Sequence, residues 1–277
     1  MGNPNGAPLR VISYGGGVQS TALVVLAAQG VIDFPVALFS NVGDDSEHPD
    51  TLDYVRNVAI PWAGERGVTI HELHRHTRDG APETLLGRLM KPGTRSVPIP
   101  VRMANGAPGN RSCTADFKIR VIAKWLKANG ANAENLATTA IGISTDEVQR
   151  INNRRRESYD LPVYPLIDLG LDRSACAQVI RDAGLPVPPK SSCWFCPFHT
   201  PGVWAEMRRD EPDLFEKSVE LERHLNTVRD DIGRDHVYFT RFAKPLDEAI
   251  SEAQTPLFTG DGHDIGETGC DEGVCFV

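Results

Sequence analysis

The sequence has no apolar run that approaches the roughly 20 residues of a membrane-spanning helix, so no membrane span is expected. Its beginning lacks the basic and then apolar pattern of a secretory signal, and Gly6 stands where N-myristoylation requires Ser or Thr. No internal repeat or low-complexity tract is present. With 277 residues, 40% hydrophobic and 24% charged, the composition is typical of a globular protein and excludes wholesale disorder. We therefore expect a cytoplasmic protein with one large domain, or one domain and an appended subdomain.

Short apolar runs alternate with helical patterns along the first 75 residues. Runs at 9–14, 34–39 and 68–73 have the length of buried strands, and helical patterns follow the first run at 20–29 and the second from Pro49. This β-α-β-α-β order predicts an α/β fold with a doubly wound, mostly parallel sheet. Residues 77–111 show no period and are expected to form a loop. Further elements are expected as a helix from Cys113, a strand at 136–143 and helices at 172–183 and 201–226.

The expected domains are contiguous in sequence. We place the α/β domain at 1–184, a helical extension that carries a Cys-x-x-Cys pair at 185–253, and a glycine-rich acidic tail with two cysteines at 254–277.

Three consecutive glycines, Gly15, Gly16 and Gly17, stand between the first strand and the first helix. Glycines let backbone N–H groups approach an anion, and the helix N-terminus adds the positive end of its dipole. The lysine of a Walker loop is missing, and Ser20 replaces the last glycine of a dinucleotide fingerprint. A phosphate-binding loop of another kind is therefore the favoured interpretation, and a turn without a ligand is the alternative.

The run at 15–20, Gly-Gly-Gly-Val-Gln-Ser, resembles the SGGxDS loop of the PP-loop ATP pyrophosphatase superfamily, which includes the phosphoadenylylsulfate reductases. Three further segments resemble the reductase-like branch, and they occur in the same order. They are 39–51 with Glu47, Pro49 and Thr51, then 111–118 with Cys113 and Lys118, then 141–150 with Arg150. The similarity covers about residues 9–205.

This resemblance implies an adenine nucleotide alpha-hydrolase-like fold that binds ATP with Mg²⁺ and grips the departing pyrophosphate. Arg150, Gln19 and Ser20 are implied as catalytic residues, with Arg150 near the α-phosphate. Gly15 stands where the family usually has Ser and Gln19 where it usually has Asp, which leaves open how Mg²⁺ is held. The nucleotide-binding residues implied by the motifs are Ser13, Tyr14, Gly15, Gly16, Gly17, Gln19, Ser20, Thr21, Ser40, Asn41 and Gly142.

Six cysteines in a cytoplasmic protein are not expected to form disulfides. Adenylylsulfate reductases hold a [4Fe–4S] cluster with a Cys-Cys pair and, about eighty residues later, a Cys-x-x-Cys pair. Here Ser112 replaces the first of these cysteines, so the resemblance implies three thiolate ligands, Cys113, Cys193 and Cys196, and one open iron. Cys275 is a candidate fourth ligand, as is Cys270, and the alternatives for these two cysteines are a mobile nucleophile that relays sulfur, or inert thiols. Structural zinc, completed by Cys270, Cys275 or His199, is the alternative, as are metal-free thiols. Cys176 is expected to be a buried core residue.

Basic residues are concentrated in the middle of an acidic protein. Residues 85–156 contain 13 Lys or Arg and 4 Asp or Glu, whereas the whole chain has a net charge of −8. This distribution favours a nucleic-acid partner at the loops 88–120 and 150–156, which include Arg154, Arg155 and Arg156. A solvated basic face is the alternative.

Together these patterns predict an ATP pyrophosphatase that adenylates a substrate for sulfur insertion. The basic loops favour a nucleic-acid substrate, as in DNA phosphorothioation or tRNA thiolation, with a sulfur donor such as a cysteine desulfurase. A reductase of adenylylsulfate or phosphoadenylylsulfate is the second hypothesis. A nucleotide-sensing interaction module is the third.

Overall fold

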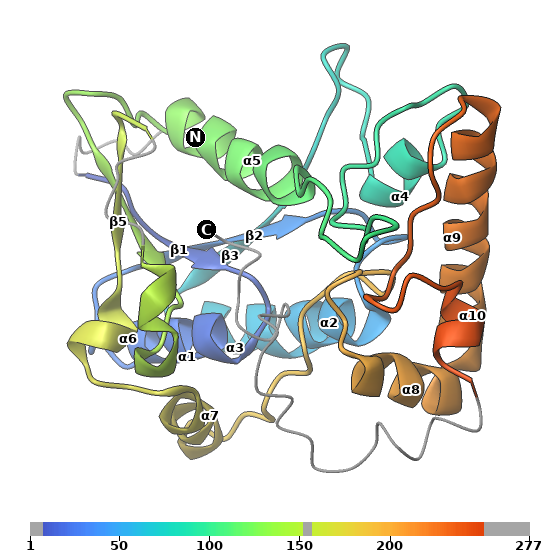
Figure 1. Ribbon diagram of the computed structural model, residues 1–277. Helices are drawn as coiled ribbons and strands as arrows, with labels where there is room; N and C mark the ends of the chain where they lie inside the picture. Colours follow the sequence, from blue (N-terminus) through green and yellow to red (C-terminus); the bar gives the residue numbers. More distant parts are fainter. Residues whose placement is uncertain (1–7, 152–156, 252–277) are drawn as a thin grey trace. The chain divides into compact units, whose positions relative to one another are not determined.

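The structure is a computed structural model that describes residues 8–151 and 157–251 (Figure 1). These residues form two compact units, and each unit is built from two stretches of chain. The first unit contains the described residues up to 83 and from 114 to 191. The second contains residues 84–113 and the described residues from 192 onward.

A five-stranded sheet forms the centre of the first unit. Its strands are β1 (Arg10–Tyr14), β2 (Val36–Asn41), β3 (Thr69–His74), β4 (Ala137–Ile141) and β5 (Asp160–Val163). Every neighbouring pair is parallel, and the order across the sheet is β3-β2-β1-β4-β5. This is a Rossmann-like arrangement, and it confirms the predicted α/β class with a parallel, doubly wound sheet.

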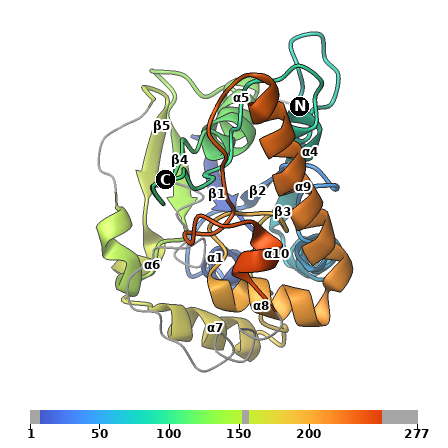
Figure 2. The ribbon, with the colours of Figure 1, turned by 45° about the vertical axis from the view of Figure 1, so that its right-hand side comes forward.

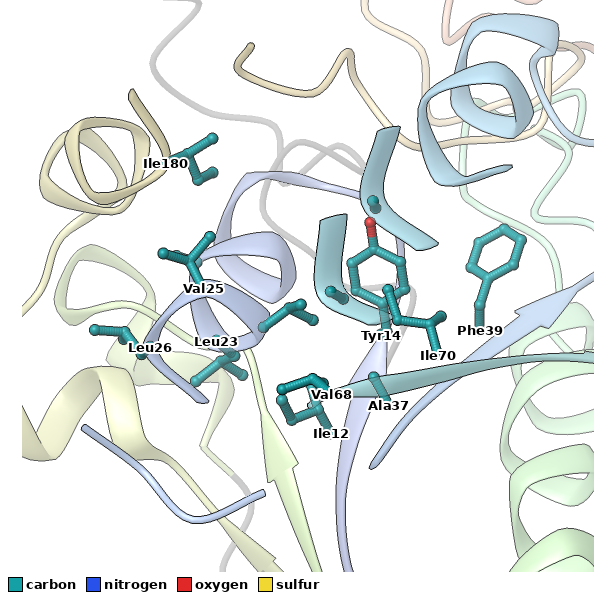
Figure 3. Packing of buried hydrophobic residues seen from close by; sticks show 14 of the residues in the cluster. Ile12, Tyr14, Leu23, Val25, Leu26, Ala37, Phe39, Val68, Ile70 and Ile180 are labelled. Carbon is teal, nitrogen blue, oxygen red and sulfur yellow. The ribbon is translucent and has the colours of Figure 1, made fainter. Parts of the chain in front are cut away.

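Helices cover both faces of this sheet. Successive side chains of a strand point to opposite faces, so each strand contributes buried side chains to both layers of helices. Ile12 and Tyr14 lie on one face in a cluster with residues of α1 (Val18–Ala28), and α7 (Arg173–Asp182) adds Ile180 on the far side of α1, near Val25, as Figure 3 shows. Val11 lies on the other face in a cluster with residues of α5 (Arg120–Ala128). Because both faces are covered, β1 has buried apolar side chains on both sides, which explains the short apolar run at its position in the sequence.

Several elements of the first unit differ from the simple sequence pattern. The helical segment after β2 consists of α2 (Pro49–Asp53), a π-helical stretch (Tyr54–Ala59) and α3 (Ile60–Gly64). A second π-helical stretch (Thr114–Ile119) precedes α5. A 3₁₀ segment (Thr145–Arg150) and α6 (Pro165–Asp168) complete the unit. The π turns add one residue to the helical repeat, which a 3.6-residue pattern does not reveal.

The second unit is helical, with α4 (Leu85–Leu89), α8 (Pro201–Asp210), α9 (Pro212–Asp231) and α10 (Leu246–Ala249). Figure 2 shows α8 and α10 beside the long helix α9. The predicted helix at 201–226 is in fact two helices, because Pro212 ends the first and occupies the first position of the second. The predicted loop at 77–111 contains α4, which Thr84 caps by accepting the Gly87 N–H. No helix in the described residues is long and apolar enough to cross a membrane.

Candidate functional site

The glycine loop lies at the switch point of the sheet. β1 is bonded to β2 on one side and to β4 on the other, so the segments that leave the carboxyl ends of β1 and β4 turn in opposite directions. In open α/β sheets ligands bind in the crevice at this point. The segments that leave β1 and β4 here are the loop of Gly15, Gly16 and Gly17 and the run from Gly142 to Arg150.

Gly16 is required by the shape of the loop. Its φ angle is +78°, a conformation that residues with a Cβ rarely adopt. A Cβ at this position would lie 3.1 Å from Cγ2 of Val55 and 3.2 Å from Cγ2 of Thr51. The loop is therefore held tightly against the helical segment that follows β2.

The first turn of α1 is not capped by a side chain. Gly17 is its N-cap residue and contributes no side-chain hydrogen bond, whereas Asp172 and Thr200 cap α7 and α8. The Ser20 hydroxyl accepts the Gly15 N–H at 3.1 Å and donates to the Gly17 carbonyl at 3.1 Å, so it organises the loop itself. An uncapped helix start behind a glycine turn is a favourable place for an anion.

Gly142 lets the segment after β4 approach this loop closely. A Cβ at Gly142 would lie 3.0 Å from the Ser20 nitrogen and 3.1 Å from the Gln19 carbonyl carbon, both of them backbone atoms. The structure thus brings two predicted site segments, 15–21 and 142–150, into direct contact.

Gln19 bridges these segments and a third one. Its Nε2 is 3.5 Å from the Ser144 hydroxyl, and its Oε1 accepts from Nη1 of Arg173 at 3.2 Å. Gln19 is only 7% exposed. The PP-loop motif that this loop resembles has a carboxylate at this position. Gln19 has an amide instead, and this amide contacts the guanidinium of Arg173.

Arg150 forms a buried ion pair with Glu147. Nη1 of Arg150 lies 2.5 Å from Oε2 of Glu147, and the two side chains are 7% and 5% exposed. Burial raises the pKa of Glu147, and the charges of Arg150 and Arg173 act in the opposite direction. Glu147 is therefore paired with Arg150 and also interacts electrostatically with Arg173, which contacts Gln19.

The segment before the Cys-x-x-Cys pair crosses the glycine loop. Ser191 donates a hydrogen bond to the Gly15 carbonyl, and its Cβ lies 3.7 Å from where a Cβ of Gly17 would be. The Tyr54 hydroxyl donates to the Pro186 carbonyl at 2.8 Å. Because one carbonyl of the loop is bonded to Ser191, the peptide plane between Gly15 and Gly16 is fixed.

Several predicted nucleotide-binding side chains are used within the protein. Ser40 donates to the Phe117 carbonyl at 2.6 Å, and Asn41 donates to both Asp44 and Glu72 at 2.7 Å. Tyr14 is fully buried, which raises the pKa of its hydroxyl, and Thr21 is 3.4 Å from that hydroxyl. Ser13, the residue before the last one of β1, is also buried.

Glu47, in the segment that follows β2, has an almost completely buried side chain. Glu47 is 1% exposed, and burial raises its pKa, while the charge of Lys118 has the opposite effect. Both residues belong to the first unit.

Three candidate metal ligands belong to the second unit. Cys113, Cys193 and Cys196 are partly exposed thiols. The Cys196 N–H donates to the Cys193 carbonyl at 3.1 Å, which places this pair in one tight turn. His199, the zinc alternative, is buried with its Nε2 2.9 Å from the Ser192 hydroxyl. Cys176, in contrast, is buried in the core of the first unit with its pKa raised to about 12, which confirms the expected core role.

Some predicted residues lie outside the described residues. They are Cys270, Cys275 and the basic run Arg154, Arg155 and Arg156. The other predicted basic segment is divided between the units, with 88–113 in the second and 114–120 in the first. Lys91 and Arg95 are exposed in this segment.

Sequence reasoning missed Arg173 and Ser191, and it assigned no role to Ser144 within the segment 141–150. A single arginine at the start of a helix carries no motif, so only the fold shows its proximity to Gln19. Comparisons with family models, curated proteins and solved structures gave no match for this chain.

Proposed function

We propose that the chain is an ATP pyrophosphatase of the PP-loop type that adenylates a substrate for sulfur insertion, with nucleic acid as the favoured substrate. The observation that carries this proposal is the uncapped start of α1 behind Gly15, Gly16 and Gly17 at the switch point of a parallel sheet. Backbone N–H groups at such a place bind polyphosphate without help from a lysine.

The proposed reaction occurs at the α-phosphorus of ATP. A substrate oxygen attacks this phosphorus, a new O–P bond forms, and the bond to the departing pyrophosphate breaks. The first-turn N–H groups of α1 hold the pyrophosphate, and Arg150 stabilises the charge that develops at phosphorus. The ion pair with Glu147 fixes the guanidinium of Arg150 before the substrate arrives.

In the second step a sulfur nucleophile takes the place of the activated oxygen, and AMP leaves with that oxygen. The donor set of Cys113, Cys193 and Cys196 fits thiolate ligation of an iron–sulfur cluster, and it also fits zinc. A [4Fe–4S] cluster with three protein ligands would supply an iron that binds the sulfur to be transferred. The positive charge of residues 85–156 supports a nucleic-acid substrate.

Pyrophosphate release by the full-length chain, purified without oxygen, tests this function. We expect release from ATP and Mg²⁺ that increases when DNA or tRNA is added, and no release by Gly16→Val, whose side chain cannot fit against Thr51 and Val55. Gly64→Ala is the matched control, because a Cβ at Gly64 contacts nothing within 4 Å.

Each alternative gives a different result in this assay. Sulfite and AMP formed from adenylylsulfate, without pyrophosphate from ATP, would replace the proposal with a reductase. Tight ATP binding without any turnover would replace it with a nucleotide-sensing module.

A further inference from the structure

Arg173 is the first residue of α7, and its backbone is bonded to the segment after β4. Its N–H donates to the Asp146 carboxylate at 3.2 Å, and the Thr145 N–H donates to the Leu171 carbonyl at 2.9 Å. α7 itself packs on α1 through the main hydrophobic cluster. The start of α7 is therefore held beside both segments that flank the switch point.

The side chain of Arg173 reaches the glycine loop through Gln19. A guanidinium only donates hydrogen bonds, so the amide oxygen of Gln19 must face Arg173, and its nitrogen then faces Ser144. A divalent cation at this oxygen would be repelled by the positive charge of Arg173 at short range. Gln19 is consequently suited to position an arginine rather than to bind a metal ion.

Three acidic residues lie near Arg173, and each accepts a hydrogen bond. Asp172 accepts the Ala175 N–H, Asp146 accepts the N–H of Arg173 itself, and Glu147 accepts from Arg150. Glu147 also interacts electrostatically with Arg173. The cluster thus places the guanidinium groups of Arg150 and Arg173 near the same buried carboxyl group.

We propose that Arg173 binds the polyphosphate of the nucleotide and that Gln19 positions its guanidinium for this contact. The proposal rests on the proposed function and identifies the charge that compensates the phosphates. A guanidinium suits this task, because its planar donors bind two phosphate oxygens at once. Gln19, the departure from the usual loop Asp, fits this arrangement, because its neutral amide accepts a hydrogen bond from Arg173 without adding a negative charge beside the phosphates.

ATP and AMP binding to the full-length chain, measured by calorimetry with Mg²⁺ and with EDTA, tests the proposal. Arg173→Ala is expected to weaken ATP binding by about tenfold or more and AMP binding by less than about twofold. Arg173→Lys is expected to recover only part of the loss, and Gln19→Glu to weaken ATP binding in EDTA. Arg181→Ala is the matched control, because Arg181 is exposed on the same helix and contacts Gln178.

Two results would overturn the inference alone. The first result is that the wild-type chain binds ATP and that Arg173→Ala binds ATP as tightly as Arg181→Ala does. Arg173 would then not contribute to ATP binding. An equal loss of ATP and AMP affinity in Arg173→Ala would show a structural role. Wild-type chain that does not bind ATP at all would overturn both this inference and the proposed function.

Discussion

At the scale of single residues, Gly142 determines how closely two loops meet. A Cβ at this position would lie 3.0–3.2 Å from backbone atoms of Gln19 and Ser20, and backbone cannot move aside as a side chain can. We predict that Gly142→Ala lowers the free energy of unfolding by about 1–3 kcal/mol and weakens ATP binding, because the two segments must separate. Urea denaturation and ATP titration of the same preparation measure both effects.

The control for this prediction is Gly64→Ala at the end of α3, where an added methyl group contacts nothing within 4 Å. Its stability is expected to change by less than about 1 kcal/mol. A Gly142→Ala variant with wild-type stability and ATP affinity would show that the close approach has no functional role.

Sequence motifs located the glycines of the site but not the roles of its polar side chains. Gly16 and Gly142 are identifiable because a positive φ angle or a close approach leaves only one residue type. Ser40 and Asn41 follow a strand at the expected place, yet their side chains bond to Phe117, Asp44 and Glu72. Such pairing depends on residues distant in sequence, so no local pattern reveals it.

At the scale of elements, Glu222 on α9 holds the chain that follows this helix. It is 2% exposed, and its two oxygens accept the N–H groups of Phe239 at 2.6 Å and Leu246 at 2.7 Å. Burial raises its pKa to about 7, although the two N–H groups act against this shift. One carboxyl group thus connects α9 with the segment that leads to α10.

The raised pKa of Glu222 gives the stability of the chain a definite pH dependence. An unfolded Glu titrates near 4.5, so the folded chain binds the proton more tightly than the unfolded chain. The contribution is complete below pH 4.5 and is lost as the pH rises through about 7, by an amount on the order of 3 kcal/mol. We predict that the wild-type free energy of unfolding falls more steeply between pH 5 and 8 than that of Glu222→Gln.

Urea denaturation at these two pH values, followed by tryptophan fluorescence, checks this slope. Glu220→Gln on the exposed side of α9 serves as the control and is expected to keep the wild-type pH dependence. Equal slopes for wild type and Glu222→Gln would contradict the prediction.

The elements that the sequence predicted well are those with a strong local pattern. β1 is buried at four of its five positions because helices cover both faces of the sheet, and α7 begins directly after the capping residue Asp172. β5 was missed because it has four residues and contains Pro162, which is unfavourable within a strand. The break between α8 and α9 could have been predicted from Pro212, because a proline rarely continues a helix.

At the scale of the whole chain, the two units are not contiguous in sequence. The predicted boundary at 184 assumed one domain after another, whereas residues 84–113 belong to the same unit as the described residues from 192 onward. Composition marks loops and charges but not which distant segments pack together. In the structure Cys113, Cys193 and Cys196 belong to the same unit, although 79 residues separate the first two of them in the sequence.

A metal centre at these cysteines would join the two segments of the second unit. Cys113 ends one segment, and Cys193 and Cys196 stand at the start of the other. Because a metal link between distant segments reduces the entropy of the unfolded chain, we expect it to stabilise this unit. We predict that Cys113→Ser, Cys193→Ser and Cys196→Ser each lower the metal content of the anaerobic protein and its melting temperature.

Elemental analysis, absorption spectroscopy and thermal melting of the full-length chain check this prediction, with Cys176→Ser as the control. About four irons per chain and a brown colour are expected, and the control keeps its metal because the Cys176 thiol is buried and has a raised pKa. Colourless protein with one zinc per chain would replace the cluster by a structural zinc site. If Cys113→Ser keeps the metal content of the wild type, a metal centre shared between the two segments is contradicted. Cys113 is the cysteine that residues 84–113 supply, so this segment would then contribute no cysteine ligand.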